Sequence, residues 1–173
     1  MSPGWASLAG CLALETVAGS TYAFSLYSGA LKNRFSYTQS DVDLVASAEN
    51  TAGLISLYCG AVYNACGSRC TCLLAMSFAV PAWLLMWSAL SNAEQDSPLW
   101  HMLLYAFMQG NAAALCDLIA VVTASAHFPT RRGEAIGMVK SFVGISGAIY
   151  SCACEPLGDE SCSEECPSPA TTA

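Results

Sequence analysis

Two long apolar runs joined by a short basic turn constrain the fold of this chain more than any other feature. The runs cover about residues 99–126 and about 135–153, and the turn between them, residues 127–134, reads HFPTRRGE. At about 1.5 Å per helical residue, each run approaches or exceeds the ~30 Å hydrocarbon core of a bilayer. Basic turns favour the cytoplasmic side. The pattern therefore predicts a helical hairpin in lipid, with Arg131 and Arg132 in the cytoplasm.

The composition also favours a lipid environment. Hydrophobic residues make up 54% of the 173 residues, charged residues only 11%, and the mean hydropathy is +0.45. Soluble domains carry about 25% charged residues. Much of the net charge of −7 comes from acids after Cys154, where the chain has no Lys or Arg. No basic surface is predicted, which excludes nucleic acid as a partner.

The distribution of apolar residues predicts an all-α, polytopic bundle of five membrane-spanning helices. We expect these helices at about residues 5–27, 41–63, 71–90, 99–126 and 135–153. Strands are disfavoured because the runs are too long and do not alternate, and helices satisfy their own backbone groups in lipid. Ser40 is expected to cap the second helix, ahead of Asp41 and Asp43. The domain would then cover residues 1–153, followed by a disordered acidic tail, 154–173.

Two questions concern the first helix and the orientation. A cleaved signal peptide is the alternative for the first segment, but no Lys or Arg precedes Lys32 and Glu15 interrupts the apolar run, so a retained helix is favoured. With a cytoplasmic N-terminus, three arginines (Arg69, Arg131, Arg132) face the cytoplasm, and Lys32 and Arg34 lie outside. This difference is small, so the basic residues alone give only weak support to that orientation.

Several motifs resemble a known family. Residues 18–32 read AGSTYAFSLYSGALK, residues 37–40 read YTQS, and residues 137–150 read GMVKSFVGISGAIY. With the HFPTRRG turn that ends at Gly133, they resemble the nodulin-like domain, a branch of the major facilitator superfamily. The matches occur in the family's order and bracket residues 5–150.

A further turn resembles the facilitator motif Gly-x-x-x-Asp-basic-x-Gly-basic-basic between the second and third helices. Gly60, Gly67 and Arg69 match it, whereas Asn64 stands in the place of the acid and two of the bases are absent. In the family these charges form a latch between helices, so the resemblance implies a looser latch here. It also implies a cytoplasmic position for this turn, and hence for the N-terminus.

The resemblance implies a secondary transporter of a small solute, which is built from two six-helix halves around a midplane site. Here the family likeness is expected to end near Ser151, so one copy would lack the sixth helix and the second half. The expected partners are the lipid bilayer, a small solute, and a second copy or a missing second half. Two alternatives remain: a non-transporting membrane protein that binds a partner through its helices, or a truncated gene product whose tail follows a wrong reading frame.

Four polar residues within the apolar runs are candidates for a transport path: Glu15, Asn50, Asp117 and Lys140. Intramembrane charges are costly and usually face a cavity, pair, or carry protons. We expect Glu15 to be protonated and to share a face with Asn50. The structural alternative is that Glu15 and Asp117 are hydrogen-bonded between helices, and that Lys140 extends to the interface.

The remaining patterns favour structural roles. Gly137 with Ser141, and Gly144 with Ala148, have the spacing of close helix contacts in membranes. Cysteines within the spans are expected to pack as small apolar residues. The tail cysteines lack the paired spacing of zinc sites, which leaves a metal-binding tail as a minor alternative to a lipidated or unstructured one. With no nucleophile–base pair or phosphate loop in the sequence, we expect no enzyme activity, no cofactor and no metal.

Overall fold

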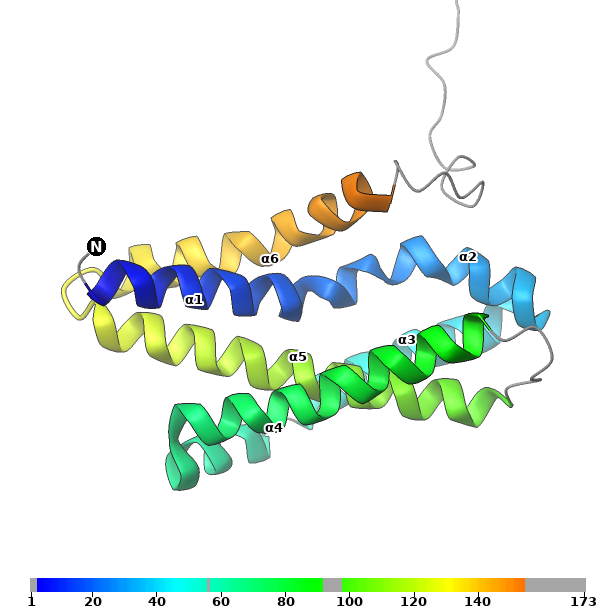
Figure 1. Cartoon of the computed structure of the whole chain (residues 1–173), viewed down its shortest axis with the longest axis horizontal. Coiled ribbons are helices and arrows are strands. Elements are labelled where there is room, and N and C mark those ends of the chain that lie inside the picture. The colour runs from blue at the N-terminus through cyan, green and yellow to red at the C-terminus, as the bar shows by residue number, and fades with distance from the viewer. Residues whose placement is uncertain (1–2, 56, 92–97, 155–173) are drawn as a thin grey trace, which may run out of the picture.

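A computed structural model describes residues 3–55, 57–91 and 98–154, and every regular element in these residues is a helix (Figure 1). The predicted all-α class is therefore confirmed for the described part of the chain. The elements are α1 (Pro3–Ala18), the 3₁₀ helix η1 (Gly19–Ala23), α2 (Phe24–Phe35), α3 (Gln39–Leu54), α4 (Leu57–Ser91), α5 (Leu99–His127) and α6 (Arg132–Cys154). The predicted tail, apart from Cys154, lies outside the described residues.

By length and composition, two helices in the described residues could each cross a membrane, namely α4 and α5. The other segments are shorter or more polar. The predicted first span, for example, is divided into α1 and α2 by five residues of 3₁₀ helix. Such a tighter turn within a helical path often marks a hinge.

The first connector lies later in the chain than predicted. The first helical segment was expected to end at about residue 27, but α2 continues to Phe35 and includes Lys32, so that expected end is wrong. The reversal instead follows Ser36, whose φ of 52° is left-handed. Thr38, rather than Ser40, caps α3: it accepts a hydrogen bond from the backbone N–H of Asp41, and the Asp41 carboxylate accepts one from the backbone N–H of Thr38. A carboxylate three residues after a threonine completes a capping box, which the sequence already contained.

The predicted second and third segments are divided differently. Helix α3 ends at Leu54, and α4 begins at Leu57 and contains the predicted turn at residues 64–69. Within α4, Gly67 has non-helical angles of φ 76° and ψ 175°, which a residue with a side chain rarely adopts. The chain bends there, as the curl of α4 in Figure 1 shows. Pro81 lies inside the remainder of α4.

Helix α5 is the centre of the bundle because it contributes to all three buried clusters. The first cluster joins α1, α5 and α6, and includes Cys11, Ala120 and Val139. The second joins α1, α4 and α5 around Leu115, and the third joins α2, α3, α4 and α5 around Met102. The buried Cys11, Cys59 and Cys116 pack among apolar residues, as predicted.

Two glycines permit the closest helix contacts. A Cβ at Gly110 of α5 would lie 2.1 Å from the backbone oxygen of Glu49 in α3. A Cβ at Gly19 of η1 would lie 1.8 Å from Ser146 Oγ in α6. The prediction that Gly137 and Gly144 mediate close contacts is wrong within this chain, since a Cβ at either would meet nothing within 4 Å.

Large apolar side chains cover much of the outer surface. Leu54 and Leu57 are 82% and 90% exposed, and Trp87 is 68% exposed. Soluble monomers rarely expose extensive apolar surfaces of this kind. The outer surface therefore suits lipid or another protein better than water.

Candidate functional site: a charge cluster between α1, α5 and α6

Glu15 is a fully buried carboxylic acid in the core of the bundle, with 0% of its surface exposed. It belongs to a buried stripe of α1 with Leu8, Cys11 and Ala18, whose spacing of three and four residues keeps them on one helix face. The same stripe packs against α5 and α6. The helical register of an otherwise apolar face therefore carries Glu15 inward.

Asp117 of α5 and Lys140 of α6 form an ion pair beside Glu15. The Lys140 ammonium donates to Asp117 Oδ1, and Glu15 interacts electrostatically with both residues. The side chains of Lys140 and Asp117 remain 47% and 37% exposed. The cluster thus reaches from the protein interior, at Glu15, to the outer surface of the bundle.

The cluster contains two acids and one base, so its charges do not cancel when all three are ionised. Neither carboxylate oxygen of Glu15 has a well-formed hydrogen bond among the described residues, although Asp117 lies close enough to interact. An ionised, unpaired carboxylate inside a protein is costly. One proton on Glu15 would remove the excess negative charge and leave the Asp117–Lys140 ion pair balanced.

Three of the four path candidates therefore come together, and Asn50 does not. Asn50 is exposed on α3 and donates from Nδ2 to the backbone oxygen of Ala46 at 2.9 Å. The expected face shared by Glu15 and Asn50 is wrong, because the residues around Glu15 come from α5 and α6. Glu49, the residue before Asn50 on α3, is the one that faces the interior of the bundle, with 5% of its surface exposed.

A second polar cluster lies between α2, α3 and α5. It consists of Tyr27, Glu49 and Gln109, and Tyr27 interacts with the other two side chains. Glu49 directly precedes the path candidate Asn50 in the sequence, but Tyr27 and Gln109 were missed. A single amide within the apolar run of α5 was the signal that could have identified Gln109.

Most of the predicted loop-motif residues are exposed, and they lie within α4 around its bend or at the start of α6. Asn64, Arg69, Arg132 and Gly133 are exposed, Gly60 is partly buried, and Gly67 forms the bend of α4. Arg131 pairs with Glu134 at 3.6 Å, with both side chains more than 70% exposed. An exposed ion pair of this kind contributes about 0–1 kcal/mol to stability. These residues are therefore better suited to setting the orientation of the helices than to binding or chemistry.

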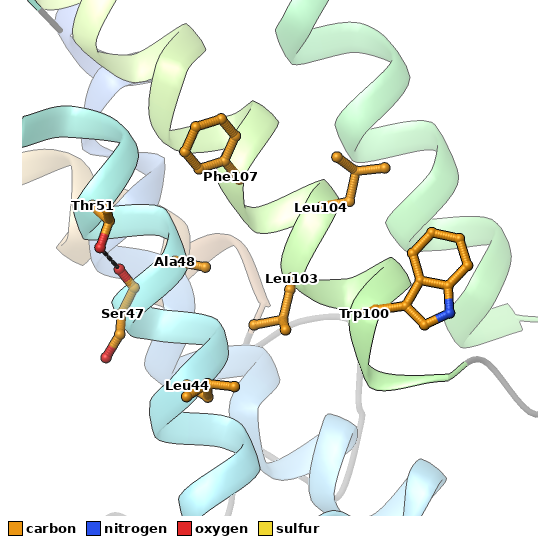
Figure 2. Close-up of a pocket in the computed structure, with 8 residues that line it drawn as sticks. All are labelled: Leu44, Ser47, Ala48, Thr51, Trp100, Leu103, Leu104 and Phe107. Carbon is orange, nitrogen blue, oxygen red and sulfur yellow. Dashed lines mark hydrogen bonds between the residues drawn. The ribbon is translucent and has the colours of Figure 1, made fainter. Parts of the chain in front are cut away.

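An open groove between α3 and α5 is almost entirely apolar (Figure 2). The Thr51 hydroxyl donates a hydrogen bond to the Ser47 backbone oxygen at 2.7 Å. Few polar groups in the groove are therefore available to bind a ligand. The lining residues are Leu44, Ser47, Ala48, Thr51, Trp100, Leu103, Leu104 and Phe107. The groove offers a packing surface and contains no titratable group.

The sequence matches the nodulin-like family over residues 4–165. The chain belongs to the nodulin-like family. The match extends beyond Tyr150, so the expectation that the likeness ends near Ser151 is wrong. No curated protein and no solved structure matches this nodulin-like chain significantly. Together with α4 and α5, the family indicates a membrane-associated, transporter-like protein.

Proposed function

We propose that this nodulin-like protein is a multi-pass component of a facilitator-type secondary transporter, and that the Glu15–Asp117–Lys140 cluster lies on its transport path. The observation that carries the proposal is the fully buried Glu15 beside an ion pair in an apolar bundle. Intramembrane ionisable residues commonly mark ion or substrate paths. A cluster with one acid in excess suits the uptake and release of a proton.

In the proposed topology the chain crosses the membrane five times. Residues 3–35 form the first span, and α3 with the beginning of α4 forms the second. The third span follows the bend at Gly67, and α5 and α6 are the fourth and fifth. Placing Arg69, Arg131 and Arg132 on the cytoplasmic side would orient the N-terminus there as well.

The partial exposure of the Asp117–Lys140 ion pair supports a transport path that this chain forms together with another protein segment. Lys140 and Asp117 are partly exposed on the chain alone, and a charge that faces hydrocarbon is strongly disfavoured. Water or a second transporter half covering this edge would remove that cost. The proposed partner is therefore a second copy or a second half, with a small solute passing between them.

Water access to the cluster tests this function. Gly144 lies one turn after Lys140 on α6, is exposed, and has open space around its Cα. We expect Gly144→Cys, in membranes, to react at least about tenfold faster with a small hydrophilic thiol reagent than Leu84→Cys, because thiols ionise in water and hardly in lipid. Leu84 is the matched control, since it is 59% exposed on α4, away from the cluster.

The labelling experiment needs a background in which only the introduced cysteine is accessible. The buried Cys11, Cys59 and Cys116 are kept, and the other native cysteines become serine. Equal and slow reaction at both positions would show that the α6 surface faces lipid, which would refute a path at this edge.

The apolar groove between α3 and α5 favours a second candidate, a non-transporting membrane protein that binds a partner helix there. The two candidates differ in the same assay. Rapid labelling next to Lys140 is expected for the transport path, whereas a partner-binding protein needs no water at that position.

A further inference from the structure

The cluster of Tyr27, Glu49 and Gln109 is buried, polar and incompletely paired. Glu49 and Gln109 are 5% and 2% exposed. Glu49 Oε1, both amide atoms of Gln109 and the Tyr27 hydroxyl lack a well-formed hydrogen bond to any described residue. Buried polar atoms are nearly always paired, and the contact between Tyr27 and Gln109 leaves Glu49 Oε1 without a partner, which indicates that a further ligand binds here.

The geometry brings these groups together from three helices. Glu49 and Gln109 lie where α3 and α5 approach most closely, next to the Gly110 contact with the Glu49 backbone. Tyr27 of α2 interacts with both side chains, and its ring packs against Trp83 of α4 with ring centres 6.2 Å apart. Packing between helices therefore keeps the tyrosine next to the carboxylate and the amide.

The charge of the cluster is unbalanced. No Lys or Arg among the described residues interacts with Glu49, and the titratable neighbour is Tyr27, which is neutral in its usual form. One positive charge would compensate the carboxylate. A proton on Glu49 would do so, whereas a cation would in addition contact the oxygens of Gln109 and Tyr27.

We propose that Tyr27, Glu49 and Gln109 form a binding site for one small monovalent cation. The site offers a carboxylate, an amide and a phenolic oxygen, and oxygen is the ligand that hard cations prefer. A single carboxylate matches a single positive charge. The metal patterns considered in the sequence could not indicate such a site, because two of its three ligands are uncharged.

This cation site is separate from the Glu15 cluster. Gln109 and Asp117 are eight residues apart on α5, which is about 12 Å along the helix. The site does not depend on the chain moving a solute. The cation comes either as a free ion or as the ammonium group of a small solute, and both sources present the same chemistry.

Thermal unfolding of the purified full chain in detergent tests the proposal. The probes are Na⁺, K⁺, NH₄⁺ and methylammonium chloride, compared with N-methylglucamine chloride at equal ionic strength and pH. We expect at least one small cation to raise Tm saturably, by roughly 5 °C at about a hundredfold excess over Kd. A response to Na⁺ or K⁺ identifies a free ion, and a response to methylammonium alone identifies an ammonium group.

The variants Glu49→Gln and Gln109→Leu should abolish this Tm increase, and Tyr27→Phe should reduce it. Asp43→Asn is the matched control, because it neutralises an exposed acid on the same helix and should keep the full increase. If Glu49→Gln does not fold, Gln109→Leu decides. The absence of a saturable increase with all four cations would overturn the proposal, as would an increase that persists in Gln109→Leu.

Discussion

Glu15→Lys is expected to impair stable insertion of the protein strongly, whereas Glu15→Gln is expected to be tolerated. Glu15 is fully buried next to Lys140. A lysine there would give the cluster two bases and one acid, and an unpaired buried charge costs about 3–5 kcal/mol. Glutamine has the size of the protonated acid and adds no charge.

The measurement is the yield of monodisperse protein extracted from membranes in mild detergent. We expect a decrease of roughly tenfold or more for Glu15→Lys, because a cost of this size is a large part of the stability of a typical protein. Glu134→Lys makes the same exchange at a side chain that is 72% exposed, and should change the yield little. Equal yields of Glu15→Gln and Glu15→Lys would refute the burial of Glu15 in the bundle.

Gly110→Ala is expected to destabilise the protein although it adds a single methyl group. The added Cβ would lie 2.1 Å from the Glu49 backbone oxygen and 2.9 Å from Ala52 Cβ, so α3 and α5 would have to separate. Overpacking of this kind costs about 1–3 kcal/mol, which exceeds the ~1 kcal/mol that alanine contributes to a helix over glycine.

Gly53→Ala is the matched control for this change. Gly53 lies on α3 and is exposed, and a Cβ added there would meet nothing within 4 Å, so its substitution should leave Tm unchanged or raise it. Thermal unfolding of both variants under identical conditions compares them. A Gly110→Ala protein as stable as the Gly53→Ala protein would contradict the close crossing of α3 and α5.

Apolar runs and turn residues were sufficient to predict the helical class and the ends of α5 and α6 within a few residues. Helices in lipid must satisfy their backbone internally, so long apolar runs leave few alternatives. The bend near Gly67 was also predictable. The division of the first span was not, because the 3₁₀ turn η1 lies where Gly19 packs closely against α6, a contact between segments far apart in the sequence.

Part of the candidate site was also predictable from the sequence. An acid or a base in an apolar run is conspicuous, which identified Glu15, Asp117 and Lys140. The face on which each lies depends on how the helices pack, and the order of residues along the chain carries no direct information about that packing. Adjacent residues on α3 illustrate this: Glu49 faces inward and Asn50 outward, which the polarity of the two side chains could not distinguish.

The most direct test of the membrane topology is two-sided labelling of Asn33→Cys and Thr130→Cys. Both positions are exposed: Asn33 lies near the end of α2, and Thr130 lies in the turn between α5 and α6. The end of α2 and the α5–α6 turn lie at opposite ends of the bundle (Figure 1). In sealed membranes we expect an impermeant thiol reagent to reach Thr130→Cys only from the cytoplasmic side and Asn33→Cys only from the other side. Labelling of both from the same side would contradict the five-span arrangement.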